Sequence, residues 1–379
     1  MNAGQEDKTR CLTEEQRLAW LRLIRSENIG PSTFRDLLDH AGSAERALEI
    51  LPALSRRGGK RSHRLCSEQD AIDELEAHRR FGARLVARGE ADYPPHLQHI
   101  DSPPPLLSIK GGQVTGKPQM AAIVGARNAS LSGRKLAAGF ARDLGAHGFA
   151  IASGLARGID AAAHEAAVPT GTLAVFAGGL SVLYPPEHGR LLAEILEAGG
   201  AAISEMPFGW KPRGRDFPRR NRLISGVSLG VVVIEAARAS GSLHTARFAL
   251  EQNRDIYAVP GSPLDPRSEG ANGLIRQGAT LARSARDVLE GLAGRTGVDL
   301  PLFHGMSETV HRPAVAPEAP ADGTRARIIE ALGPAPMQLD ELIRFVEADA
   351  RTVNVVLLEL ELAGRLERHP GQKISLVMG

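Results

Sequence analysis

Six basic side chains lie within twelve residues, at positions 211–222, and give this segment an unusual charge. The segment contains a single acidic residue, Asp216, so its net charge is +5 in a chain of formal net charge +2. Guanidinium groups match the planar geometry of phosphate, and an aromatic ring can stack on a base. The pattern favours a nucleic-acid track over the alternative, a solvated charged face. The residues predicted to bind are Lys211, Arg213, Arg215, Phe217, Arg219, Arg220, Asn221 and Arg222.

Three glycine- or serine-containing turns add to this prediction. Each follows a short apolar run and precedes a stretch with helical spacing, so backbone amides at the helix start could attract an anion. Two of the turns also carry an arginine, and a serine in the first could cap the helix. The alternative, an ordinary strand–helix turn, stays open for each turn taken alone. The predicted binding residues in these turns are Gly125, Arg127, Ser130, Arg157, Ser240 and Gly241.

Three other polar residues are interpreted as structural. Asp160 is expected to cap or brace the helix that follows the second turn, because a carboxylate disfavours a bound anion. His164 lies four residues later, on the same helix face, and a structural contact with Asp160 is favoured over a metal pair. Tyr184 is expected in the core or as a buried hydrogen-bonding group. We find no catalytic constellation and no metal-ligand set, and we expect no cofactor.

The elements that must position these residues form a parallel sheet. Short apolar runs alternate with helix-compatible stretches, which is typical of strands covered by helices on both faces. Ligands of such sheets bind where strands lead into helices. The fold class is therefore α/β, with a Rossmann-like core. The apolar runs are 121–124, 149–152, 173–176, 201–203, 231–234 and 256–259.

Smaller domains are predicted on either side of the sheet domain. Residues 10–80 have helical spacing, interrupted at Gly30-Pro31, and resemble a SAM or helix–hairpin–helix domain, although a plain packing module is favoured over a DNA clamp. Residues 81–293 form the Rossmann-like domain, and the proline-rich residues 294–322 a linker. Residues 323–379 suggest three helices and a hairpin, a winged-helix-like domain for which protein contact is favoured over DNA reading. We expect mild proteolysis to release this last domain.

Composition excludes several classes of protein. The near-balance of 46 basic and 44 acidic residues excludes a uniformly basic DNA-coating protein. Two cysteines cannot form a disulfide framework, and neither lies in a zinc-binding pattern. The charged N-terminus lacks the apolar core of a leader, and the longest uncharged run is broken by glycine and proline. We therefore expect a cytoplasmic protein with no membrane partner.

The ordered motifs resemble the DprA/Smf family of bacterial DNA-processing proteins. Any one of them is weak evidence of kinship, whereas their number and order are specific. The resemblance covers roughly residues 10–290 and, more loosely, the C-terminal domain. The matching strings include IVGARNAS (123–130), SGLARGIDAAAH (153–164), AGGLSVLYPPEH (177–188), FPRRNRLISG (217–226) and GANGLIRQGA (270–279).

This resemblance implies a function. Members of the family bind single-stranded DNA without known catalysis, form dimers through the Rossmann-like domain, and load the RecA recombinase onto incoming strands during natural transformation. Carried over to this chain, the binding residues are Arg127 and the 217–222 run, with Arg157 and Ser240–Ser242 as weaker matches. His244 departs from the apolar residue expected in the family.

Two enzymatic alternatives belong to other classes. Related Rossmann-like proteins hydrolyse the N-glycosidic bond of nucleoside monophosphates through a PGGxGTxxE string, which residues 240–251 echo only faintly. A dinucleotide-dependent oxidoreductase is disfavoured because the GxGxxG fingerprint is absent. Release of free base, as opposed to retention of labelled single strands, would discriminate the first alternative from a DNA-binding mediator.

Overall fold

The computed structural model describes residues 11–60, 63–295, 322–369 and 371–377. These residues form two compact units. The first, called here the sheet unit, covers residues 74–295. The second, the terminal unit, combines residues 12–73 with residues 322–377.

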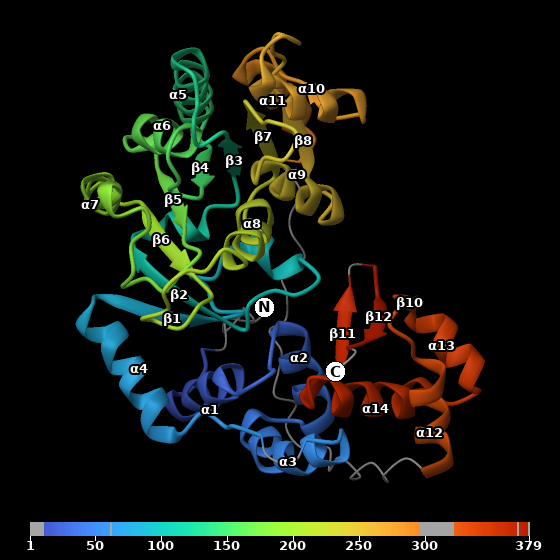
Figure 1. The fold of residues 1–379 in the computed structure, drawn as a ribbon. Helices are drawn as coiled ribbons and strands as arrows, with labels where there is room; N and C mark the ends of the chain where they lie inside the picture. Colours follow the sequence, from blue (N-terminus) through green and yellow to red (C-terminus); the bar gives the residue numbers. More distant parts are fainter. Residues whose placement is uncertain (1–10, 61–62, 296–321, 370, 378–379) are drawn as a thin grey trace, which may run out of the picture. The chain divides into compact units, whose positions relative to one another are not determined.

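Among the described residues, nine strands form the sheet of the sheet unit, in the order β1-β2-β6-β5-β4-β3-β7-β8-β9 (Figure 1). The seven strands from β6 to β9 in this order are parallel, and β2 pairs with β6 and β1 in antiparallel register. The strands are β1 (Ala83–Ala87), β2 (Leu106–Gly111), β3 (Met120–Gly125), β4 (Ala150–Ser153), β5 (Thr172–Val175), β6 (Ala201–Ser204), β7 (Gly230–Ile234), β8 (Asp255–Ala258) and β9 (Thr280–Leu281).

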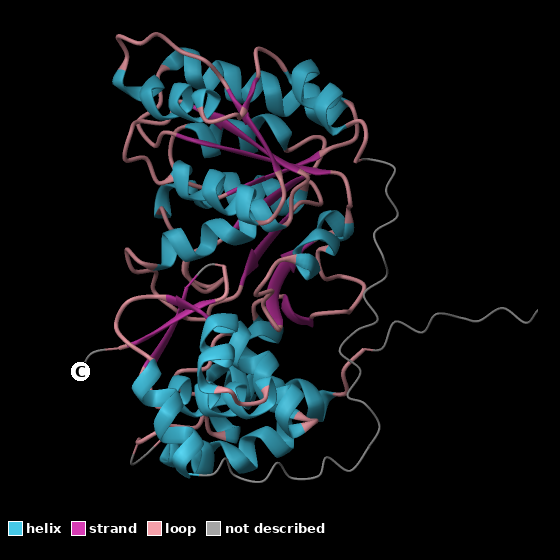
Figure 2. Ribbon diagram, turned by 90° about the vertical axis from the view of Figure 1, so that its right-hand side faces the viewer, coloured by secondary structure: helices cyan, strands magenta, loops and turns pink. Residues whose placement is uncertain are grey.

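Helices cover both faces of this sheet (Figure 2), because alternate strand residues point to opposite sides. Ala122 and Val124 of β3 pack in a core with α8 and α9, whereas Ala121 and Ile123 pack in a second core with α5, α6 and α11. The α-helices that follow β3 in the sheet unit are α5 (Leu131–Ala146), α6 (Ile159–Ala167), α7 (Gly189–Glu197), α8 (Asp216–Gly226), α9 (Ser242–Glu251), α10 (Glu269–Arg276) and α11 (Ala285–Leu292).

The strand order reverses between β3 and β7. From β3 the chain winds through β4, β5 and β6 to one side, and it then returns to place β7 on the other side of β3. Open parallel sheets usually bind ligands at such a reversal, at the carboxyl ends of the strands. The β3–α5 turn and the end of β7 therefore lie where a nucleotide would be expected.

The terminal unit combines N-terminal helices with a small C-terminal domain. Trp20 packs edge-on against Phe34 with the ring centroids 5.1 Å apart, and helix α2 begins at Pro31 as the Gly30-Pro31 pair predicted. The N-terminal helices are α1 (Glu14–Arg25), α2 (Pro31–Ala41), α3 (Ala44–Arg57) and α4 (Glu68–Arg80), of which α4 continues into the sheet unit. The C-terminal elements are α12 (Asp322–Ala331), β10 (Met337–Gln338), α13 (Leu339–Val346), α14 (Ala350–Leu362), β11 (Leu366–His369) and β12 (Lys373–Leu376).

The predicted fold class is confirmed: a parallel-dominated sheet with helices, an N-terminal helical domain and a C-terminal winged helix. The apolar runs did not predict β1, β2 or the two-residue strands β9 and β10. The linker predicted at 294–322 lies, except for its two ends, outside the described residues.

Candidate nucleic-acid interface

An open hollow of about 300 Å³ lies at the carboxyl ends of β3 and β4, beside the start of α8. It is built from four segments of the chain: the turn after β3, the turn after β4, the segment before α7, and α8 itself. Its lining therefore combines guanidinium groups with aromatic rings. The lining residues are Arg127, Gly154, Ala156, Arg157, Tyr184, Pro185, Phe217 and Arg220.

Arg127 and Phe217 are in direct contact at this hollow. The guanidinium carbon of Arg127 lies 5.1 Å from the centroid of the Phe217 ring, a cation–π distance. Phe217 also meets Tyr184 edge-on, with centroids 5.3 Å apart and planes at 65°. Arg127 is exposed, and none of the ion pairs among the described residues involves it. Its charge and the two rings are thus available to one ligand.

Tyr184 differs from its predicted role. It was expected in the core or in a buried hydrogen bond, but its relative exposure is 48%. The tyrosine lies in the segment before α7, whose course over the strand ends could not be read from local spacing. Its ring adds an aromatic surface to the hollow that the sequence analysis did not include among the binding residues.

Arg157 also lines the hollow, and it has an acidic partner. Its Nε donates to Glu187 at 2.5 Å, and both side chains are largely exposed. An exposed pair of this kind contributes little to stability. The guanidinium is therefore held near the hollow by an ion pair that a phosphate could displace.

Arg220 is buried, unlike the exposed Arg127 and Arg157 of the same hollow. Its guanidinium packs against Gly154, where a Cβ atom would lie 2.5 Å from Nη2, and Nη1 donates to the carbonyl oxygens of Gly154, at 2.8 Å, and Val175. Burial lowers the pKa of Arg220 to about 10, so it stays protonated at neutral pH. Its edge reaches the hollow, while its hydrogen bonds go to Gly154 after β4, Val175 of β5 and Asn221 of α8.

Asp160 and His164 are structural, in agreement with the sequence analysis, but they do not contact each other as expected. Asp160 accepts hydrogen bonds from the amides of Gly154 and Ala156 at 3.1 and 3.3 Å. His164 Nδ1 lies 2.7 Å from Thr172 Oγ1, and its Nε2 accepts from the Leu155 amide at 3.3 Å. Burial lowers the pKa of His164 to about 3, which leaves it neutral.

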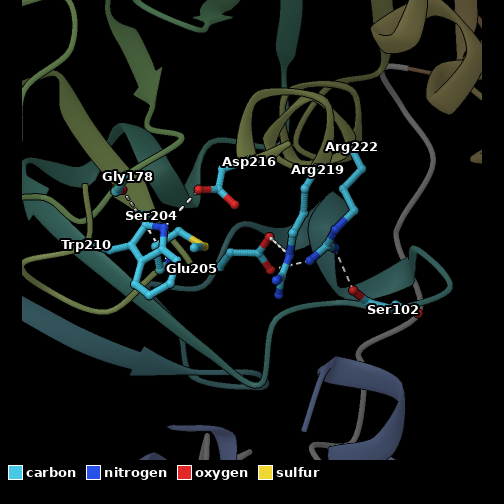
Figure 3. A network of polar contacts seen from close by, with 9 residues as sticks. Ser102, Gly178, Ser204, Glu205, Trp210, Asp216, Arg219 and Arg222 are labelled. Carbon is cyan, nitrogen blue, oxygen red and sulfur yellow. Dashed lines mark hydrogen bonds and ion pairs between the residues drawn. The ribbon is translucent and has the colours of Figure 1, made fainter. Parts of the chain in front are cut away.

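Arg219 and Arg222 converge on one buried carboxylate (Figure 3). Glu205, which follows β6, accepts from Arg219 Nε at 3.1 Å and from Arg222 Nη2. Arg222 is mostly buried and also donates to the carbonyl of Ser102. Neither arginine lines the hollow. In this structure both guanidinium groups pair with Glu205, whose single negative charge offsets one of the two positive charges and which the count of charges in 211–222 omitted.

The remaining basic residues of the run, Lys211, Arg213 and Arg215, are exposed. The loop that carries them is fixed by Asp216, which accepts from Trp210 Nε1 at 2.9 Å (Figure 3). Asp216 also accepts from the amide of Arg213 at 2.8 Å. The Arg213 guanidinium lies 4.5 Å from the centroid of the Trp210 ring. Among the ion pairs of the described residues, none involves these three side chains.

Gly125 and Ser130 are placed away from the hollow. A Cβ atom at Gly125 would lie 1.8 Å from the Ile234 carbonyl oxygen, so this glycine permits close packing of β3 on β7. Ser130 caps α5 by accepting from the Gly133 amide at 2.9 Å. Its own amide donates to Glu235 at 2.8 Å, and its hydroxyl also contacts that carboxylate. The α5 N-terminus thus has an internal carboxylate where an anionic ligand was expected.

Asn221, Ser240 and Gly241 form a separate contact. Asn221 is buried and donates from Nδ2 to the Gly241 carbonyl at 3.1 Å, while the hydroxyls of Ser240 and Ser242 are 2.7 Å apart. None of the three predicted residues lines the hollow. Their predicted DNA contacts stay predictions.

Comparison with known proteins identifies the family. Residues 84–293 match the family model described as DNA recombination-mediator protein A, which is more than half of the chain. The chain belongs to the DprA/Smf family. Residues 14–77 match the DprA-like N-terminal HHH domain, and residues 312–372 match the DprA winged helix domain. The family's domain models thus cover both units.

Relatives in the DprA/Smf family match most of the chain. The protein Smf of Escherichia coli (strain K12) is 38% identical over 295 residues, which is 77% of each chain. The protein Smf of Synechocystis sp. is 29% identical over 399 residues, covering 96% of this chain and 99% of the relative.

Two solved DprA structures share the fold. DNA processing protein A from Streptococcus pneumoniae superposes with a TM-score of 0.58 at 31% identity, covering 74% of this chain and 98% of that chain. DNA processing protein A from Helicobacter pylori superposes with a TM-score of 0.51 at 26% identity, covering 56% of this chain and 96% of that chain, and was described for its single-stranded DNA binding mode.

The described residues contain neither a cluster of metal-binding side chains nor a helix that could cross a membrane. No group of three or more histidine, cysteine or acidic side chains in the described ranges could hold a metal ion. Within the same ranges, every helix is too short or too polar to cross a membrane.

Proposed function

We propose that this DprA/Smf family member binds single-stranded DNA in the hollow at the ends of β3 and β4. The observation that carries the proposal is the exposed Arg127 guanidinium, which lies on the Phe217 ring without a carboxylate partner among the described residues. The cation would bind a phosphate, and the two rings would stack on a base. Lys211, Arg213 and Arg215 would extend the phosphate contacts along the loop before α8.

The biological role follows from the family. We infer that the bound strand is protected and passed to the RecA recombinase during natural transformation, and that the chain acts as a dimer through its sheet unit, without catalysis of its own. These activities would occur in the cytoplasm. A strand that is held by phosphate contacts and by stacking exchanges without breaking a covalent bond, which suits transfer to a recombinase.

The alternative, hydrolysis of nucleoside monophosphates, has less support. Its phosphate-binding motif would have to lie at residues 240–251, which echo it only faintly. Assay of free-base release from a nucleotide panel separates this alternative from strand binding.

Titration of a fluorescent oligonucleotide tests the DNA-binding proposal. We expect the wild type to bind a single strand more tightly than the matching duplex, and its affinity to fall with salt by about 0.7 in log–log slope for each phosphate contact. Arg127→Ala should weaken binding and reduce the slope by about one contact. Arg286→Ala, an exposed arginine on α11 paired with Glu290, is the matched control. Equal salt slopes for Arg127→Ala and Arg286→Ala would contradict a phosphate contact at Arg127.

A further inference from the structure

Helix α14, the third helix of the C-terminal domain, is buried along two different stripes. One stripe, formed by Val353, Val356, Leu357 and Leu360, packs in the core of its own domain with Ile328, Leu342 and Ile374. The second consists of Val355, Leu358, Glu359 and Leu362, spaced as one helix face. All four residues of the second stripe are buried, although they are not part of that core. This second face must be covered by something outside the C-terminal domain.

The covering elements are α2 and α3 of the N-terminal domain, which lie against α14 within the terminal unit (Figure 1). Gly58, directly after α3, faces the backbone of α14 so closely that a Cβ atom would lie 1.9 Å from the Glu359 carbonyl oxygen. Asn28, directly before α2, donates from Nδ2 to the Leu362 carbonyl at 3.1 Å. Backbone approach of this kind requires closely matched surfaces.

Charged groups on both sides of this contact are paired with one another. Glu359 is fully buried, and its carboxylate meets Arg325 of its own domain and Arg57 of α3, the latter at 3.8 Å. Removal of one partner from a buried ion pair leaves an uncompensated charge, so these residues disfavour any other partner that lacks a matching cation.

A second polar group continues the contact along α2. Glu361 accepts from Thr33 Oγ1 at 2.9 Å and from Arg368 Nε at 2.9 Å. Arg368 also donates to Asp36 of α2 at 2.7 Å. The contact thus includes hydrogen bonds and ion pairs to α2 and α3, in addition to the apolar residues of the second stripe.

We propose that the C-terminal winged helix is an intramolecular binding module, whose third helix binds α2 and α3 of the same chain and does not read DNA. Helix-turn-helix proteins place their recognition helix in the DNA groove, where basic and polar side chains contact phosphates and bases. In this protein the corresponding helix is covered by the N-terminal domain. It also presents two carboxylates, Glu359 and Glu361, which would repel phosphate.

A cleavable chain tests this proposal. A protease site is inserted between residues 305 and 318 of the full chain, the protein is cut, and the two pieces are applied together to size-exclusion chromatography at micromolar concentration. We expect the C-terminal piece to elute with the rest of the chain, in contrast to the release expected from the sequence. Separation of the wild-type pieces at this concentration would overturn the proposal.

Gly58→Ala tests whether the observed contact holds the pieces together. Gly58 has right-handed backbone angles, φ −67° and ψ −11°, that alanine also adopts, so the added methyl group acts only through its collision with α14. We expect the pieces to associate at least roughly fivefold more weakly, since overpacking commonly costs 1 kcal/mol or more. Gly333→Ala, a glycine of the C-terminal domain with no atom within 4 Å of the added methyl group, is the control.

Circular dichroism of each uncut variant verifies that it folds. If a folded Gly58→Ala protein associates after cleavage as tightly as the wild type, the pieces are held by a different surface and the proposal fails. Unchanged association of Gly333→Ala together with weakened association of Gly58→Ala supports it.

Discussion

Neighbouring arginines in one basic run have different partners, and this difference decides what each can bind. Successive residues of a helix are turned by about 100°, so Arg220 points away from Arg219 and Arg222, which lie three residues apart on one face of α8. Two of them meet Glu205, and Arg220 enters the turn after β4. The cation that lines the hollow with no ion pair among the described residues comes instead from Arg127, after β3. Local charge density therefore indicated a segment that reaches the hollow but not the partner of each side chain.

Phe217→Leu tests base stacking at the hollow. Leucine keeps an apolar side chain but removes the ring that contacts Arg127 and Tyr184. If a base stacks here, affinity for single strands should fall by about 1–3 kcal/mol. The salt slope should stay close to that of the wild type, because no phosphate contact is removed. Fluorescence anisotropy across a salt series measures both quantities, and a changed slope with unchanged affinity would argue against stacking.

Buried histidines predict a loss of stability in acid. Burial lowers the pKa of His164 to about 3 and that of His96 to about 4, whereas an unfolded histidine titrates near 6.5. Between these values the unfolded chain binds more protons than the folded one, so the free energy of unfolding falls as pH drops below about 6.5. The expected slope is about 1.4 kcal/mol per pH unit for each histidine.

Urea unfolding midpoints at pH 5 and pH 7 test this expectation. The loss of stability on acidification should be smaller in His164→Gln than in the wild type, because one group that gains a proton on unfolding is gone. An equal loss in both proteins would mean that His164 is not the neutral, buried group described here.

At the scale of elements, the start of α5 has a carboxylate of the protein itself at a place where parallel sheets commonly bind an anion. The helix begins beside the reversal of strand order, where a parallel sheet commonly binds phosphate. Glu235, at the end of β7, has a left-handed φ of 51° and reaches the Ser130 amide. An internal carboxylate thus stabilises the helix terminus, while the hollow beside α8 keeps the exposed cation. The anion site implied by the turn pattern and the observed hollow are therefore different places.

Two glycines of α5 give a matched test of this arrangement. A methyl group at Gly133 would lie 2.5 Å from the Glu235 carboxyl carbon, whereas one at Gly139 meets nothing within 4 Å. Gly139→Ala should stabilise the protein by roughly 0.5–1 kcal/mol through helix propensity. Gly133→Ala should destabilise it, because the Glu235 carboxylate must move away from the helix start. Thermal unfolding of the two variants checks the opposite signs, and stabilisation by both would contradict the role of Glu235.

At the scale of the whole molecule, the hollow proposed to bind DNA and the contact of α14 with α2 and α3 belong to different units. The hollow consists entirely of sheet-unit residues, and α2, α3 and α14 all lie in the terminal unit. This separation allows each function to be altered alone.

Removal of residues 306–379 tests the separation. The truncated chain should retain its affinity for single strands within about twofold, since every lining residue of the hollow remains. Its N-terminal helices should exchange amide hydrogens faster, because the α14 surface that covers them is lost. Hydrogen-exchange mass spectrometry and strand titration measure the two effects, and a large loss of strand affinity would mean that the terminal unit contributes directly to binding.

The sequence by itself determined the strands from β3 to β8, the family and the segments that form the candidate site. Alternating apolar runs and helical spacing are local properties, so they predicted β3 to β8 and placed α14 at residues 350–362. The ordered motifs led to the family in the same way. Arg127 and Phe217 belong to two of these motifs, and they line the same hollow.

Only the tertiary structure decided the partner of each side chain. Ser130 meets a carboxylate 105 residues away, and Asn28 meets a carbonyl 334 residues away. Such pairs leave no periodic trace in the chain, because hydrogen bonds and ion pairs depend on distance in space. The second stripe of α14 is a similar case. Its apolar residues Val355, Leu358 and Leu362 are visible in the sequence, but the surface that covers them is not.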